Sequence, residues 1–76
     1  DQMNVAFYPN PVNNQLTVKA PMDGVLAIYN NAGKRVLGER FSQETLLDVS
    51  ALPNGLYLLS LEGNKGQFFT RISVQH

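Results

Sequence analysis

The stretch Leu52-Pro53-Asn54-Gly55-Leu56-Tyr57-Leu58-Leu59-Ser60-Leu61 joins a turn to the most apolar run of the chain. Pro53 fixes φ at about −65°, and Asn54 and Gly55 tolerate the backbone geometry that a turn needs. The run that follows is too short for an ordinary helix, so we expect a central β-strand buried on both faces. Because side chains alternate along a strand, Leu56 and Leu58 would lie on one face. The other, inward face would carry Tyr57, Leu59 and Leu61.

Six further segments have the length and residue types of short strands: residues 5–8, 15–20, 25–29, 35–37, 45–50 and 67–74. Turn residues separate them, at 9–11, 21–24, 30–34 and 62–66. Alternation places Leu16, Val18 and Ala20 inward. It also puts Leu47 and Val49 on one face of their strand, and Phe68, Thr70, Ile72 and Val74 on one face of the last strand. Residues 25–29 are apolar enough to be covered on both sides. About seven short strands predict an all-β fold, an immunoglobulin-like antiparallel β-sandwich without the Cys…Trp…Cys pattern of antibody domains.

Composition limits the classes of function. The 76 residues suffice for one domain, and 43% hydrophobic against 16% charged residues favours a folded chain. The formal net charge is +0, so no charge pattern for nucleic acid or an anionic membrane is present. No apolar run is long enough to span a bilayer. The chain begins at Asp1 without a signal peptide, and we expect it to be cut from a longer protein.

Catalytic and metal-binding patterns are weak. The only histidine, His76, stands at an end expected to fray, and there is no cysteine. The serines have no base nearby in sequence, and the six acidic residues are scattered. No run resembles a calcium-binding loop. We therefore expect no active site, no metal and no cofactor.

Four motifs together resemble a known family. The first is Tyr8-Pro9-Asn10-Pro11 followed by Leu16-Thr17-Val18, and the second is Ile28-Tyr29-Asn30-Asn31-Ala32-Gly33-Lys34-Arg35-Val36. The third is Leu47-Asp48-Val49-Ser50-Ala51-Leu52-Pro53-Asn54-Gly55-Leu56-Tyr57, and the fourth is Arg71-Ile72-Ser73-Val74. In order and spacing they resemble the type A C-terminal sorting domains of the type IX (Por) secretion system. That family often carries Asp where Asn30 stands, and often a second basic residue where Thr70 stands.

The resemblance implies a function that composition does not. Residues 1–76 would form a single, non-catalytic C-terminal sorting domain of an exported bacterial protein. It would direct its passenger from the periplasm through the outer membrane to the cell surface or beyond. The implied partners are the type IX translocon and shuttle proteins and a sortase-like cysteine protease that removes the domain, with no direct membrane insertion.

Ten residues at motif positions are the candidates for recognition: Pro9, Asn10, Pro11, Gly33, Lys34, Arg35, Pro53, Gly55, Tyr57 and Arg71. Each also has a structural explanation. The prolines can end strands, the glycines can form turns, and Tyr57 can bond a backbone group as in a tyrosine corner. The three basic residues are either solubilising charges or contacts for an acidic partner surface. Phe69 would be exposed, and could support docking by strand addition, if the last strand lies at an edge.

Two other classes of function stay open at this stage. One is an adhesive or carbohydrate-binding sandwich module of a bacterial surface protein. It would need an exposed aromatic platform, and the chain has no Trp. The other is an inert spacer domain, which could be replaced by an unrelated sandwich without loss of localisation.

Overall fold

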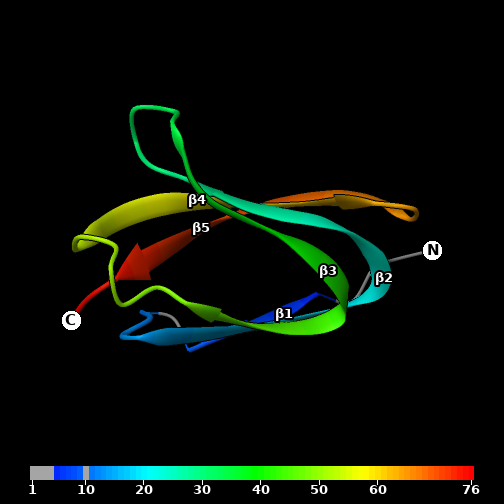
Figure 1. Ribbon diagram of the computed structural model, residues 1–76, viewed down its shortest axis with the longest axis horizontal. Coiled ribbons are helices and arrows are strands. Elements are labelled where there is room, and N and C mark those ends of the chain that lie inside the picture. Colours follow the sequence, from blue (N-terminus) through cyan, green and yellow to red (C-terminus); the bar gives the residue numbers. More distant parts are fainter. Residues whose placement is uncertain (1–4, 10) are drawn as a thin grey trace.

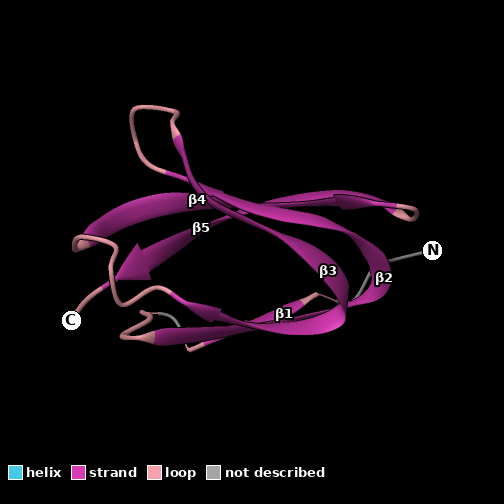
Figure 2. Cartoon of the chain, viewed as in Figure 1, coloured by secondary structure: helices cyan, strands magenta, loops and turns pink. Residues whose placement is uncertain are grey.

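The computed structural model describes residues 5–9 and 11–76. This part of the chain contains five strands and no helix (Figure 2). In chain order they are β1 (Ala6–Tyr8), β2 (Gln15–Tyr29), β3 (Arg35–Asp48), β4 (Gly55–Gly63) and β5 (Gly66–Val74). The strands pair antiparallel in one sheet of order β1-β2-β4-β5, and β3 also pairs with β2. The prediction of an all-β antiparallel fold is confirmed.

The sheet curls because β2 is shared between two parts of it. The first half of β2 lies between β1 and the end of β3, with Val18 opposite both Phe7 and Thr45. The second half lies between the start of β3 and β4, with Leu26 opposite Leu61. In Figure 1, β4 and β5 form the upper side and β1 lies on the lower side, while β2 and β3 run through both. The enclosed space holds the core.

Both long strands bend at the same place. The pairing passes from Lys19–Glu44 to Asp23–Ser42, so three residues of β2 face only Gln43 of β3. Pro21 is among those three, and its missing N–H costs nothing where the ladder is interrupted. Gln43 has φ of 66°, in the left-handed region that a non-glycine residue rarely adopts. This bulge re-aims both strands.

The strand count therefore differs from the prediction of seven. The segments at 15–20 and 25–29 are halves of β2, and those at 35–37 and 45–50 fall largely within β3. The turn predicted at 21–24 is wrong, because those residues continue β2 through the bulge. Proline and glycine marked a change of direction here without a break in the strand.

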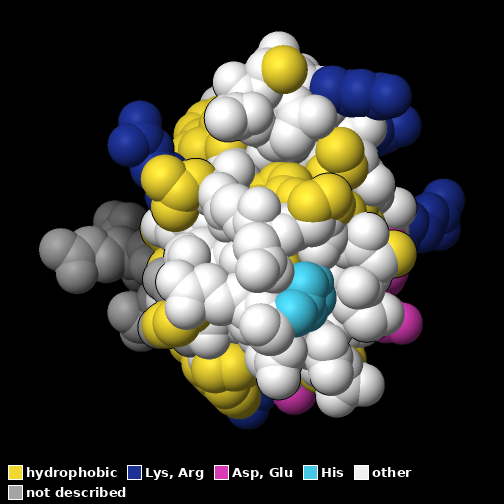
Figure 3. All heavy atoms as spheres, turned by 90° about the vertical axis from the view of Figure 1, so that its left-hand side faces the viewer, with side chains coloured by type: hydrophobic (Ala, Val, Ile, Leu, Met, Phe, Trp, Pro, Cys, Tyr) yellow, Lys and Arg dark blue, Asp and Glu magenta, His cyan; other side chains and the backbone are white. Residues whose placement is uncertain are grey.

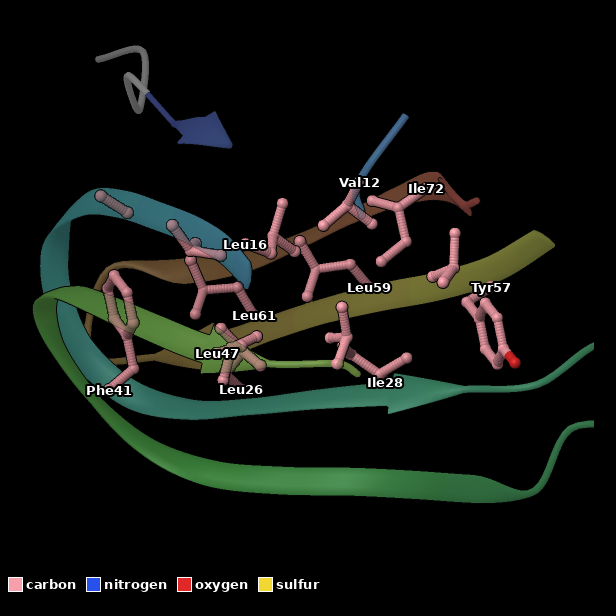
Figure 4. Close-up of a cluster of buried hydrophobic side chains, with 14 of the residues drawn as sticks. Val12, Leu16, Leu26, Ile28, Phe41, Leu47, Tyr57, Leu59, Leu61 and Ile72 are labelled. Atoms are coloured by element: carbon pink, nitrogen blue, oxygen red, sulfur yellow. The ribbon is translucent and has the colours of Figure 1, made fainter. Parts of the chain in front are cut away.

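The core fills the inner face of the curled sheet (Figure 4). The positions predicted to face inward are all buried: Leu16, Val18, Ala20, Tyr57, Leu59 and Leu61. Of the two further faces that alternation defines, Leu47, Val49, Ile72 and Val74 are buried, and Phe68 and Thr70 are half-buried. The bend adds Met22 and Phe41, and the segment before β2 adds Val12. The fully buried large side chains are Leu16, Leu26, Ile28, Leu47, Leu59, Leu61, Ile72, Val12, Val18, Val49 and Val74.

The outer face of β4 corrects the sequence analysis. Leu56 is 61% exposed and Leu58 is 37% exposed, so the prediction of burial on both faces is wrong. Val25 is also exposed, against the expectation for 25–29, although Ala27 beside it is buried. The strand is central, with β2 and β5 as neighbours, but no second layer of the described chain covers its outer face. Its apolar content reflects an exposed surface as well as a core.

Candidate functional site

The family-like motifs gather at one end of the curled sheet. In Figure 1 this is the left-hand end, where the loop before β2, the hairpin between β2 and β3, the β3–β4 connection and the end of β5 lie. The bend of β2 and β3 and the turn at Asn64 and Lys65 lie at the opposite end. Segments from both ends of the chain thus contribute to one surface, which we call the motif end.

The β3–β4 connection is fixed by hydrogen bonds from its own residues. The Ser50 N–H donates to Asp48 Oδ1 (3.0 Å), and Leu52 N–H donates to the Val49 carbonyl (3.0 Å). Hydrogen bonds from the Ser50 hydroxyl and then from its N–H lower the pKa of the exposed Asp48 carboxyl. The hydrogen-bonded turn therefore spans Val49 to Leu52, upstream of the predicted turn at Pro53.

Tyr57 holds the end of the same connection. Its hydroxyl donates to the Pro53 carbonyl over 2.6 Å, and the residue as a whole is only 7% exposed. This is the arrangement expected of a tyrosine corner, and that prediction is confirmed. Gly55 opens β4 with φ of 156° and pairs with Val74 at the end of β5.

The end of β5 and the residues after it contact Val12, between the two parts of the first motif, and the third motif. Val12 lies parallel to Val74, donates to the Ser73 carbonyl and accepts from Gln75 N–H, both over 2.8 Å. The His76 N–H donates to Asn54 Oδ1 (2.9 Å), and His76 Nε2 lies 2.6 Å from the Leu52 carbonyl. The frayed end predicted at His76 is therefore wrong. The His76 imidazole thus contacts the backbone carbonyl of Leu52.

The β2–β3 hairpin loop is organised by Asn30. Its Oδ1 accepts hydrogen bonds from the N–H groups of Ala32 and Lys34, each over 3.0 Å. Its backbone N–H donates to the Lys34 carbonyl and its carbonyl accepts from Gly33 N–H. Gly33 has φ of 86°, as the sequence predicts for the turn residue of this loop. The loop is a closed, preformed unit.

A groove lies between this loop and the outer face of β4 and β5. It has a volume of about 600 Å³. One wall is the hairpin loop and the other surfaces come from the ends of β2, β4 and β5. The lining residues are Tyr29, Asn30, Asn31, Gly33, Leu56, Tyr57, Leu58, Phe69 and Arg71. The second, third and fourth motifs therefore meet in one concave site.

The predicted site residues divide by their position relative to the groove. Gly33, Tyr57 and Arg71 line it. The exposed Lys34 follows Gly33 in the loop, and the Arg35 side chain lies against Gly38 on β3. Four others are exposed at the motif end outside the groove: Pro9, Pro11, Pro53 and Gly55. Asn10 lies outside the described residues.

The charge of the groove is one-sided. None of its lining residues is acidic, and Arg71 contributes a cation. Across the described residues the single ion pair joins Lys19 and Glu44 over 3.9 Å, on β2 and β3 near the bend. Figure 3 shows the motif end face on, with Lys and Arg side chains projecting around its upper part and hydrophobic patches between them. The described residues contain no cluster of side chains able to hold a metal ion.

The comparison with protein families assigns the chain. A family model described as "Secretion system C-terminal sorting domain" matches residues 6–75, nearly the whole chain. The chain belongs to this family. It is a type IX secretion C-terminal sorting domain, which implies a protein exported through the outer membrane. No curated protein and no solved structure gave a significant match. Within the described residues, no helix is long and apolar enough to cross a membrane.

Five residues of the sorting domain's groove are absent from the site residues predicted from the sequence: Tyr29, Asn30, Asn31, Leu56 and Leu58. The signal for the leucines was present, because alternation places them on the face opposite Tyr57 and Leu59. They were assigned to a buried face because an apolar run resembles a doubly covered strand. The sequence predicts an exposed Phe69 if the last strand lies at an edge; β5 ends the sheet order, and Phe69 is 56% exposed.

Proposed function

We propose that this sorting domain is recognised as a folded shape through its motif end. The type IX translocon and its shuttle proteins would bind that end and carry a preceding passenger through the outer membrane. A sortase-like cysteine protease at the cell surface would then remove the domain. The domain supplies recognition and no chemistry of its own, in keeping with its family.

The observation that supports this proposal is the convergence of the motifs. The Val12–Val74 bridge joins the segment between the two parts of the first motif to the fourth motif, and the His76–Asn54 hydrogen bond joins the chain's end to the third. The groove then brings the second motif against the third and fourth. This surface exists only in the folded chain. A receptor that binds it would therefore bind folded sorting domains and would not bind unfolded ones or unrelated proteins.

The candidate residues have two kinds of role in this proposal. Gly33, Gly55 and Tyr57 shape the loops, as their dihedral angles and hydrogen bond indicate. Exposed residues would contact the partner: Pro9, Pro11, Lys34, Arg35, Pro53 and Arg71. Rigid prolines lose little conformational entropy on binding, and exposed cations attract an acidic partner. The immunoglobulin-like outline of the domain stays a prediction.

The decisive test is localisation of a fluorescent protein fused ahead of residues 1–76 and given a periplasmic signal peptide. Matched bacterial strains with and without a working type IX system would express it. We expect surface delivery and loss of the C-terminal piece in the competent strain alone. Retention of the intact fusion in the periplasm of both strains would contradict the proposal and favour the adhesive or spacer function.

A further inference from the structure

We propose that the groove between the hairpin loop and the outer face of β4 and β5 binds an extended peptide of the secretion machinery. The peptide carries an aliphatic or aromatic side chain next to a carboxylate. This inference rests on the proposed function and adds to it the location of the binding surface and the chemistry of its partner. It follows from the floor, the charge and the shape of the groove.

The floor is apolar and exposed. Leu56 and Leu58 of β4 lie on the same outer face as Phe69 of β5, and all three are exposed. Large apolar side chains grouped in a concave surface typically mark an interaction site. An aliphatic or aromatic side chain of a partner would remove this surface from water. We therefore infer that the partner carries an aliphatic or aromatic side chain that packs on this floor.

The charge of the groove supplies the other half. Arg71 is exposed, lies opposite Leu58 in the β4–β5 register and lines the groove, which contains no carboxylate. The described residues place their ion pair elsewhere, between Lys19 and Glu44. A guanidinium binds a carboxylate through two parallel hydrogen bonds, and this pairing strengthens beside an apolar surface that excludes water. An acidic residue next to the apolar one therefore matches the groove.

The shape favours an extended segment. The Asn30 hydrogen bonds and the left-handed Gly33 hold the hairpin loop as a preformed wall, so binding orders little of the domain. On the side away from β4, the described partner of β5 is Val12, which meets it at Val74. Among the described residues, no segment other than β4 pairs with β5 along Phe69 and Arg71, so this edge can accept a peptide strand. Alternate side chains of that strand would face the groove.

Selection from a random octapeptide library displayed on phage tests this inference directly. The immobilised domain would be the bait, and the Arg71→Glu domain would be the counter-bait. We expect enrichment of peptides that place Asp or Glu beside Leu, Ile, Val or Phe, with affinity lowered about tenfold by Arg71→Glu and by Phe69→Ser. Arg40→Glu is the matched control, since Arg40 is an exposed cation of β3 outside the groove.

Three results would overturn the inference: no enrichment, enrichment without acidic residues, or equal loss of affinity in the Arg40→Glu control. Binding of lipopolysaccharide vesicles that depends on Arg71, without any selected peptide, would also overturn it. Circular dichroism would first establish that each variant melts like the unchanged domain. If Phe69→Ser does not, Leu56→Gln would replace it, since Leu56 is the most exposed residue of the floor.

The localisation assay separates this inference from the proposed function. In a type IX-competent strain we expect Arg71→Glu to reduce surface delivery of the fusion, and Arg40→Glu to leave it unchanged. Normal delivery of Arg71→Glu would reject the groove while leaving the sorting function intact. Failure of the unchanged fusion to reach the surface would reject the sorting function, whatever the library selects.

Discussion

At the residue scale, Gly24 of β2 and Gly63 of β4 let two strand backbones approach too closely for a side chain. These two residues are paired, and a Cβ on Gly24 would overlap the Glu62 carbonyl. A Cβ on Gly63 would likewise overlap the Asp23 carbonyl. The clash is with backbone, so no side-chain rotation relieves it. The strands can cross this closely because both positions lack a side chain.

We therefore expect Gly24→Ala to lower the free energy of unfolding by about 3 kcal/mol or more, because β2 and β4 must separate. Urea denaturation of the domain would measure it. Gly38→Ala is the matched control. The atom nearest to a Cβ at Gly38 is a guanidinium nitrogen of the flexible Arg35 side chain, at 3.2 Å. The control should change stability by less than about 0.5 kcal/mol. Equal effects of the two substitutions would contradict the close approach.

Asp48 gives a second residue-scale prediction, on pH. Hydrogen bonds from Ser50 lower the pKa of this carboxyl below its usual 3.8 in the folded state. Its stabilising effect is therefore complete above the usual pKa and is lost as the pH falls through the lowered, folded-state pKa. We expect Asp48→Asn to be less stable than the unchanged domain at pH 7, with the difference shrinking in acid. Urea midpoints measured against pH would test this, and a difference independent of pH would exclude it.

The sequence predicted the inner face well and the special residues poorly. Alternation identified Leu16, Val18 and Leu59 as buried because a strand has a fixed two-residue period. It did not identify Gly24 as a crossing point or Gln43 as a left-handed residue. Those properties come from neighbours distant in sequence, and a one-dimensional pattern does not contain them.

At the element scale, the two long strands are the main departure from prediction. The turn residues Pro21 and Gly24 suggested a break, and the structure shows β2 continuing through a bulge. Turns and strand bends use the same residue types, because in both the hydrogen-bonded pairing with the neighbouring strand is interrupted. Glycine, which has no side chain, and proline, which lacks an N–H, suit both. The structure shows a bend and no turn, because residues 35–48 of β3 pair with β2 on both sides of it.

The hairpin loop supplies the element-scale prediction. The Asn30 side chain accepts two backbone N–H groups, and a carboxylate at this position could accept both. We expect Asn30→Asp to keep stability within about 0.5 kcal/mol and Asn30→Ala to lose about 1–2 kcal/mol. Chemical denaturation would measure both. A loss in Asn30→Asp equal to that in Asn30→Ala would show that the acceptor oxygen does not organise the loop.

At the scale of the whole molecule, the family was predictable from the sequence and the groove was not. The motifs are local strings, so their order and spacing suffice to recognise them, and the family model over residues 6–75 confirms that reading. The groove depends on how the Asn30–Gly33 loop stands over Leu56, Leu58 and Phe69. That contact joins three strands, and it follows from the bend and the curl of the sheet rather than from any one motif.

Recognition of a folded shape makes a prediction that recognition of linear motifs does not. Leu59 is fully buried, and Leu59→Ala should cost about 2–5 kcal/mol. A single domain of this size has a total stability of only roughly 5–15 kcal/mol, so this loss removes a large share of it and raises the unfolded fraction about 30-fold or more. The motif residues proposed for contact would all remain. We expect surface delivery of the fusion to fall, and to recover in part at lower growth temperature.

Leu46→Ala provides the matched control, because it removes the same atoms from a side chain that is 56% exposed on β3. It should leave both the melting temperature of the domain and surface delivery of the fusion unchanged. Leu59→Ala would be followed by thermal melting and by the localisation assay in parallel. Suppose that the Leu59→Ala domain has a lowered melting temperature yet is delivered to the surface like the control. The machinery then recognises the motifs in an unfolded chain. In that case the convergence of the motifs at one end serves folding alone.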